Sequence, residues 1–133
     1  MRILTLCSIL ALVAVPPAMA ASLSATVESG VKKEVAEHSA HNGTCAAQHV
    51  VVRITTLPAN GTATTAEEDR IVPAVAKLGG PQSCAGDTMP AAVVYYQSKP
   101  GFKGTDQFKY QRTNKDNPND RLNGEIVINV TVN

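Results

Sequence analysis

The chain has 133 residues, of which 44% are hydrophobic, 17% charged and 4% aromatic, and its formal net charge is +1. This length suits one domain, and the hydrophobic content is too high for a disordered chain. No stretch is a run of Lys and Arg. The sequence therefore gives no reason to expect nucleic acid or an anionic membrane surface as a partner.

The first twenty residues have the pattern of a secretory signal peptide, and its short length is typical of bacteria. Arg2 is followed by a mostly apolar stretch, residues 3–15, and by Ala18-Met19-Ala20, which has the small-residue spacing of a cleavage site. The apolar stretch is shorter than the roughly 20 residues that cross a bilayer, and an uncleaved anchor is the alternative. We expect residues 1–20 to be removed on export to the periplasm or the exterior. Residues 21–133 would then form the mature domain, with no transmembrane segment.

The predicted mature chain contains two cysteines, Cys45 and Cys84. In an oxidising compartment, a lone pair of cysteines indicates one disulfide. A redox-active or metal-binding pair is the alternative, but these residues lack the C-x-x-C spacing that would support it.

Alternation of apolar and polar residues predicts a series of short β-strands. The pattern is clearest in residues 125–132 and is repeated in residues 50–54. Residues 22–27, 95–96 and 108–110 are expected to form further strands, and Pro and Gly fall mostly between these segments. Six or seven short strands separated by turn residues predict an all-β fold, an antiparallel β-sandwich.

Three stretches give weaker signals. Residues 30–41 are interpreted as a strand plus a loop. Residues 66–78 have a helical composition but contain Pro73, so we expect an irregular crossing there. Residues 114–124 are interpreted as a polar hairpin loop rather than a calcium-binding loop, because Gly is absent at the position that such loops need.

Residues 93–96 read VVYY, and residues 99–110 read KPGFKGTDQFKY. This stretch resembles the signature of bacterial Ig-like and cadherin-like domains, in which a strand ending in Tyr precedes P-x-F-x-G-x-D-x-F-x-Y and a valine-rich strand closes the domain. Residues 57–62 are similar to the P-x-x-G-T hairpin of the same family. The resemblance implies an Ig-like sandwich of about seven strands, with signature positions at Tyr96, Pro100, Phe102, Gly104, Asp106, Phe108 and Tyr110.

The signature residues also have physical interpretations. Phe102 is expected to fold back over one end of the sandwich, and Phe108 and Tyr110 share one face of a strand. Tyr110 is expected to be structural, with its hydroxyl bonded to upstream backbone as in a tyrosine corner. Asp106 is placed to accept backbone N–H groups and to stabilise a turn. Domains of this family usually occur as tandem copies, whereas we expect a single domain here. The chain also differs from the family in carrying a cysteine pair and a long insertion, roughly residues 63–90.

All three histidines lie around Cys45, as His38-x-x-His41 and His49. Imidazoles at this spacing could bind Zn²⁺ or Cu²⁺, with Glu34 or Glu37 as a further ligand. The alternative is a polar loop tethered by a disulfide, in which Cys45 cannot act as a ligand.

No sequence motif supports catalysis, since neither G-x-S-x-G nor H-E-x-x-H occurs. We therefore predict an exported, non-catalytic module without a cofactor, which binds an unidentified protein or surface polymer through loops at one end of the sandwich. The alternative is a periplasmic metal-binding protein that uses His38, His41 and His49. A small enzyme is a third possibility.

Overall fold

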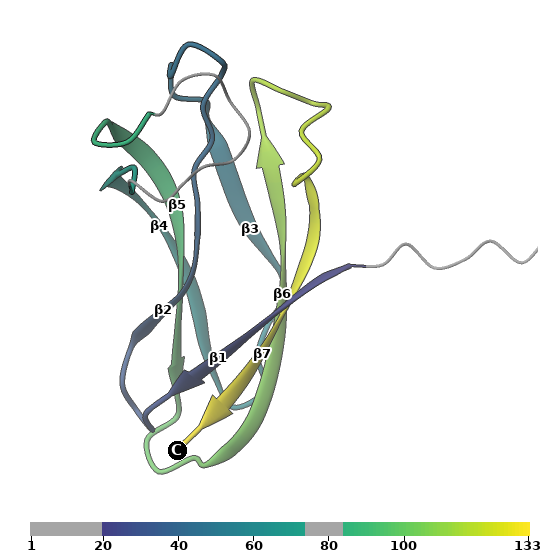
Figure 1. Cartoon of the computed structure of the whole chain (residues 1–133). Helices are drawn as coiled ribbons and strands as arrows, with labels where there is room; N and C mark the ends of the chain where they lie inside the picture. The colour runs from purple at the N-terminus through teal and green to yellow at the C-terminus, as the bar shows by residue number, and fades with distance from the viewer. Residues whose placement is uncertain (1–19, 74–83) are drawn as a thin grey trace, which may run out of the picture.

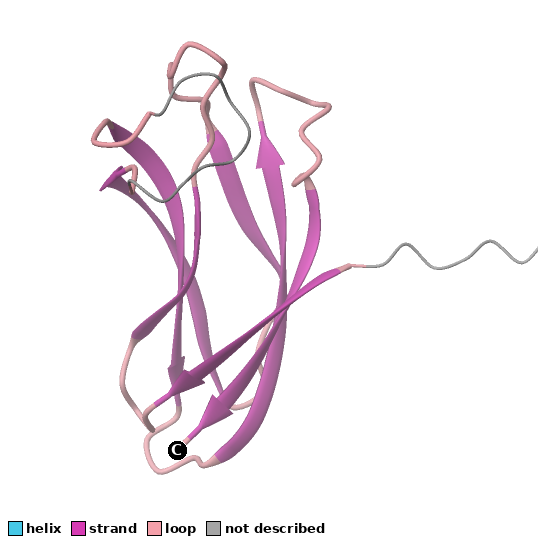
Figure 2. Cartoon of the chain, viewed as in Figure 1, coloured by secondary structure: helices cyan, strands magenta, loops and turns pink. Residues whose placement is uncertain are grey.

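The computed structural model describes residues 20–73 and 84–133, which form a β-sandwich of seven strands (Figures 1 and 2). No helix in these two ranges could span a membrane. The predicted signal peptide, apart from Ala20, lies outside the described residues, as do residues 74–83 of the predicted insertion. The strands are β1 (Ala21–Val27), β2 (Lys33–His38), β3 (Val50–Thr56), β4 (Gly61–Ile71), β5 (Thr88–Ser98), β6 (Gly104–Asn114) and β7 (Gly124–Val132).

The strands form two sheets, with orders β1-β7-β6-β3 and β2-β5-β4. The prediction of an antiparallel β-sandwich of about seven strands is therefore confirmed, with one pairing between strands that is parallel. Strand β1 pairs with β7 in parallel, from Ala21 opposite Ile126 to Val27 opposite Val132. Both strands run toward the same end of the sandwich, so the N-terminal strand joins this sheet at its edge as a parallel neighbour (Figure 1).

The core lies between the sheets and is built from the inward-facing residues of each strand. On β6, Phe108 and Tyr110 alternate with more exposed residues, as a half-buried strand requires. Tyr96 on β5 stacks against Phe108 from the opposite sheet, with ring centroids 6.0 Å apart, and Tyr110 lies 6.4 Å from Phe108. These three fully buried rings therefore join the two sheets through the centre of the core.

The expectation of an irregular crossing over residues 66–78 is wrong for its first half. Residues 66–71 continue β4 and pair with β5 as far as Ile71 opposite Thr88. Pro73 comes only after this pairing has ended, so it does not interrupt the strand. The predicted insertion of residues 63–90 is correspondingly shorter, because its two ends belong to β4 and β5, and the connection between them is residues 72–87.

The remaining interpretations of weak segments agree with the structure. Residues 30–41 contain strand β2 followed by loop, and residues 115–123 form a connection between β6 and β7.

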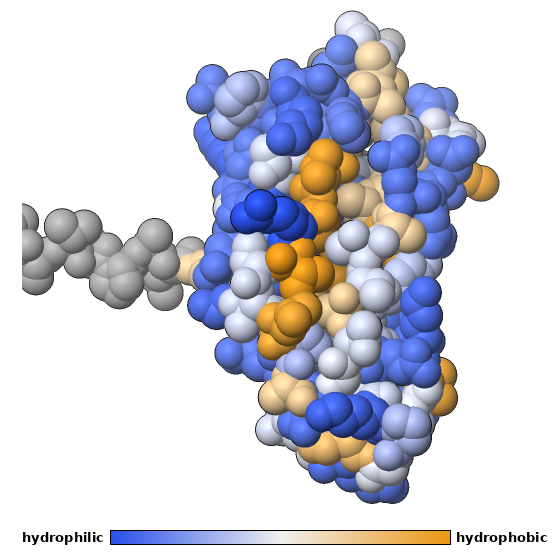
Figure 3. Space-filling model, turned by 180° about the vertical axis from the view of Figure 1, so that it is seen from behind, coloured by the Kyte–Doolittle hydropathy of each residue, from blue (hydrophilic) through white to orange (hydrophobic). Residues whose placement is uncertain are grey.

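On the side where edge strands β3 and β4 approach each other, a shallow groove of about 220 Å³ is lined by Val50, Val51, Val52 and neighbouring residues. Figure 3 shows an apolar stripe between polar borders on the face turned away in Figure 1.

Two signature residues, Asp106 and Tyr96, hold the end of the sandwich where β3 turns into β4. The Asp106 carboxylate accepts N–H bonds from Ala59 and Asn60 at 3.1 and 2.9 Å, and the Tyr96 hydroxyl donates to it at 2.8 Å. Asp106 thus accepts backbone N–H groups, and these groups belong to the turn of the P-x-x-G-T segment, not to the connection that directly precedes β6. Phe102 packs against the core, as expected for a residue that covers this end.

Candidate functional site

Three connections meet at the opposite end of the sandwich, which we call the loop end (Figure 1). They are residues 39–49, the described parts of residues 72–87, and residues 115–123. Between them lies a pocket of about 460 Å³, which we call the loop-end pocket. Its lining combines apolar side chains with charged and amide groups, as binding pockets commonly do.

The floor of the loop-end pocket includes an arginine that is almost completely removed from water. Arg112 follows Phe108 and Tyr110 on the inward face of β6 and is only 1% exposed. Its Nη1 and Nη2 both donate to Asp120 Oδ2, at 3.0 and 3.1 Å, and Nη1 also lies 3.3 Å from Asn123 Oδ1. A buried charge needs a partner of this kind. Toward the loop end, the residues that fill the interior of the sandwich thus change from aromatic rings to an ion pair.

Asp120 is held in its charged form by its surroundings. Burial alone would raise the pKa of its carboxyl, but hydrogen bonds from Asn114, from the Leu122 backbone and from Arg112 outweigh burial and lower the pKa. Asp120 and Arg112 therefore form a closed, neutral ion pair. Arg112 Nε remains buried without a hydrogen-bond partner in the described part of the chain.

The rim of the loop-end pocket is apolar and exposed. Ile71, at the end of β4, is 70% exposed, and Leu122, in the β6–β7 connection, is 63% exposed. Both residues line the pocket, together with Ala40, Val72 and Pro73. Ile71 and Leu122 are two of the five large hydrophobic side chains that are exposed among the described residues. Their convergence on one pocket gives this end an exposed apolar surface.

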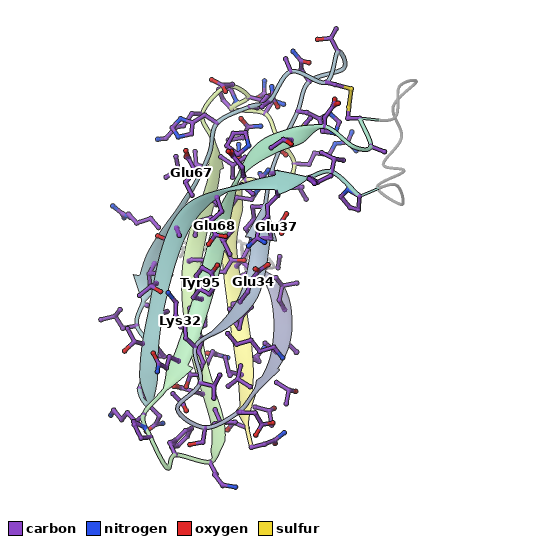
Figure 4. The ribbon with its side chains drawn as sticks, turned by 90° about the vertical axis from the view of Figure 1, so that its left-hand side faces the viewer. Lys32, Glu34, Glu37, Glu67, Glu68 and Tyr95 are labelled. Carbon is purple, nitrogen blue, oxygen red and sulfur yellow. A yellow bond between two sulfur atoms is a disulfide. The ribbon has the colours of Figure 1, made fainter. Side chains whose placement is uncertain are left out.

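Next to the pocket, the outer face of the β2-β5-β4 sheet carries Glu34, Glu37 and Glu68 (Figure 4), and all three lie near Arg70. Arg70 Nη2 lies 2.7 Å from Glu34 Oε2 and 3.1 Å from Glu68 Oε2, and Arg70 Nε lies 3.7 Å from Glu37 Oε2. The Tyr95 hydroxyl donates a short hydrogen bond to Glu68, which raises the pKa of Tyr95. Lys32 Nζ lies 4.4 Å from the centre of the Tyr95 ring on the same face, so the three carboxylates are accompanied by two cations.

The structure separates the histidines that the sequence grouped together. His38 points into the sandwich, where its Nε2 lies 2.7 Å from the Tyr110 hydroxyl. His41 lines the pocket with its Nδ1 3.5 Å from Cys84 Sγ, and His49 lies 3.9 Å from Glu67. Residues 20–73 and 84–133 contain no group of three or more His, Cys, Asp or Glu side chains that could hold a metal ion. Neighbours in sequence thus lie in three different environments.

The hydrogen-bond partner of the Tyr110 hydroxyl is His38, which differs from the prediction. Tyr110 is fully buried, as a structural residue should be, but its hydroxyl bonds to this histidine rather than to upstream backbone as in a tyrosine corner. Burial, with a smaller contribution from the positive charge of Arg112, lowers the pKa of His38 to about 4. The imidazole is therefore neutral near pH 7.

One wall of the pocket is fixed covalently. Cys45 and Cys84 form the predicted disulfide, with their Cα atoms 5.5 Å apart. The bond joins the connection of residues 39–49 to the connection between β4 and β5, which contains Cys84. Within that connection, Asn42 Oδ1 accepts N–H bonds from Thr44 and Ala46 at 2.9 and 3.0 Å. These bonds hold the short turn in which Cys45 adopts a φ of 62°.

Sequence reasoning missed the residues that form this pocket, namely Ile71, Leu122, Arg70, Arg112 and Asp120. For Arg112 a signal was present: the alternation that places Phe108 and Tyr110 on the inward face continues to position 112. A charged residue on that face predicts a buried ion pair. The pairing with Asp120 depends on how the β6–β7 connection folds, and local sequence does not show this.

Comparison with known proteins leaves the chain without a family. No protein-family model matches it, and no curated protein matches it. Among solved structures, it is similar to the solution structure of amebosin, with 15% sequence identity and a TM-score of 0.41 over 87% of this chain and 100% of that chain.

Proposed function

We propose that this protein is an exported, non-catalytic Ig-like module that binds a protein or polymer partner at its loop end. The observation that carries the proposal is the loop-end pocket, where exposed Ile71 and Leu122 meet polar groups over a buried ion pair. The fold places this pocket at the end opposite the Asp106 turn, on connections whose sequence can vary without disturbing the core. The Cys45–Cys84 bond is in keeping with an oxidising compartment outside the cytoplasm.

A comparison of surface variants tests the site. The wild-type protein, an Ile71→Asp, Leu122→Asp double variant and a Leu57→Asp control are immobilised and exposed to extract of the source cells. Leu57 is 74% exposed but lies in the β3–β4 turn at the other end. We expect one partner to be captured by the wild type and the control and to be lost with the double variant. Equal capture by all three proteins, or loss with Leu57→Asp alone, would show that the loop-end pocket is not the site.

Export is tested separately. The intact mass of protein recovered from the periplasm or the medium should correspond to a chain that begins at Ala21. Recovery of the full-length chain from the membrane fraction would show instead that residues 1–20 act as an anchor.

A further inference from the structure

The loop-end pocket has an uneven charge distribution, and this bears on what it can bind. The floor is neutral, because Arg112 and Asp120 compensate each other. On the wall formed by β2 and β4, the charged residues that line the pocket are Glu37 and Arg70. Glu34 and Glu68 are not among the lining residues, but they also pair with Arg70, so this guanidinium is shared among three carboxylates. The charge of Glu37 is therefore only partly compensated.

Glu37 is the carboxylate on this wall with the weakest partner. It lines the pocket, and its Oε2 is 3.7 Å from Arg70 Nε, beyond hydrogen-bond distance. Glu34 and Glu68 lie closer and occupy Nη2 of the same guanidinium. Glu37 is 39% exposed and can therefore accept a hydrogen bond from a cation that approaches from solvent.

The other features of the pocket suit a peptide. Ile71 and Leu122 offer an exposed apolar contact, which a partner's apolar side chain would bury. In the floor, Arg112 is 99% buried, and its Nε–H has no acceptor in the described part of the chain. A peptide segment can offer an apolar side chain, a cationic side chain and carbonyl acceptors within a few residues.

We propose that the loop-end pocket recognises a segment of a partner protein in which an apolar side chain stands next to a lysine or arginine. The apolar side chain packs against Ile71 and Leu122, and the cation pairs with Glu37. This inference rests on the proposed function and specifies the chemistry of the partner.

Selection from a phage-displayed library of random dodecapeptides on the immobilised, disulfide-bonded protein tests this inference. The enriched peptides are synthesised, and their affinities are measured for the wild type and for variants whose melting temperatures match it. We expect enrichment of an apolar residue next to Lys or Arg. Ile71→Asp, Leu122→Asp should weaken binding by more than about tenfold, as expected for loss of buried aliphatic contact.

Glu37→Gln tests the charge. It should weaken binding by about twofold to fivefold, the size of a partly exposed ion pair, and should reduce the dependence of affinity on salt. Glu125→Gln is the matched control, because Glu125 is 40% exposed and pairs with Lys109 on the other sheet. This variant should bind as the wild type does.

The possible failures are distinguishable. Peptides that need Ile71 and Leu122 but are acidic or uncharged, and that bind equally well to Glu37→Gln, would overturn this inference and leave the proposed function in place. Peptides that bind the Ile71→Asp, Leu122→Asp variant unchanged, or a selection that enriches no peptide, would count against both.

Discussion

At the scale of single residues, buried polar groups hold both ends of the sandwich. Asp106 takes three backbone N–H groups and the Tyr96 hydroxyl at one end, and Arg112 is paired with Asp120 at the other. Between these ends, His38 and Tyr110 form a side-chain pair across the two sheets. Because each of these groups lies in the interior, removing one partner leaves the other without compensation.

The Tyr110 ring and its hydroxyl contribute separately to stability. Tyr110→Ala should lower the free energy of unfolding by about 3–5 kcal/mol, because it removes a fully buried aromatic side chain. Tyr110→Phe keeps the ring and loses only the bond to His38, so it should cost about 1 kcal/mol. Denaturant midpoints measure both. Similar values for the two variants would mean that ring packing matters less than the structure indicates.

His38 makes stability depend on pH in a defined window. Its pKa is about 4 in the folded protein and 6.5 ordinarily, so the unfolded chain binds the proton more readily. The contribution of neutral His38 to the free energy of unfolding is fully present above pH 6.5. As pH falls toward 4, this contribution is lost, and the free energy of unfolding decreases by about 2–3 kcal/mol. The pKa values of Asp106 and Asp120 are lowered below 3.8, so these groups act mainly at lower pH.

Unfolding curves between pH 7 and pH 4 measure this effect. His38→Gln, which cannot take up the proton, should flatten the dependence of unfolding free energy on pH. His49→Gln, at an exposed position, should leave it as in the wild type. A slope that His38→Gln does not change would assign the effect to other groups.

At the scale of strands, the pairing of β4 with β5 depends on the absence of a side chain at one position. A Cβ at Gly61 would lie 2.5 Å from the Gln97 carbonyl oxygen and 2.7 Å from the Tyr96 ring. Neither neighbour can move freely, because Gln97 belongs to the centre of the sheet and the Tyr96 hydroxyl is bonded to Asp106.

Gly61→Ala should therefore destabilise the protein by about 1–3 kcal/mol, the usual cost of overpacking. Gly43→Ala is the control, because a Cβ at Gly43 would have no atom within 4 Å. Thermal unfolding of the two variants makes the comparison, and equal melting temperatures would show that the β4–β5 pairing adapts to the added methyl group.

Strands that bury an apolar face in the core can be predicted from the sequence. The full length of a strand without such a face cannot. The alternation in β7 and β6 indicates strands because one side of each packs into the core. Most of β4 is exposed, so residues 66–71 have no apolar period, although they are fully paired with β5. The three histidines, which are close in sequence, are separated in the structure for a related reason: His38 alternates into the interior from β2, whereas His41 and His49 lie beyond that strand.

At the scale of the whole molecule, the Asp106 turn and the loop-end pocket lie at opposite ends of the sandwich. Pro100, Phe102, Gly104 and Asp106 lie toward the end with the Asp106 turn, and Phe108 and Tyr110 lie in the centre of the core. Along β6, the stretch from Asp106 to Arg112 in the pocket floor spans roughly 20 Å. Substitutions on the rim of the pocket should therefore leave global stability nearly unchanged, whereas substitutions of Asp106 should lower it.

The Cys45–Cys84 disulfide lies at the loop end but contributes to the stability of the whole domain. Cys45 and Cys84 are 39 positions apart, and closing a loop of this size restricts the unfolded chain by about 4 kcal/mol in the chain-entropy model. The Cys45→Ser, Cys84→Ser double variant should lose about 2–4 kcal/mol in guanidinium denaturation. Wild-type protein measured under reducing conditions is the matched comparison, and midpoints that stay at the oxidised value would contradict the prediction.

The parallel pairing of β1 with β7 determines how the domain would respond to mechanical force. A load that pulls residue 21 and residue 133 apart acts along both strands in opposite directions, because the load enters β1 at its start and β7 near its end. Hydrogen bonds along the seven paired positions are then strained in shear and together, rather than opened one after another from one end. Held by its two ends, the domain should extend little until this pair of strands slides apart as a unit.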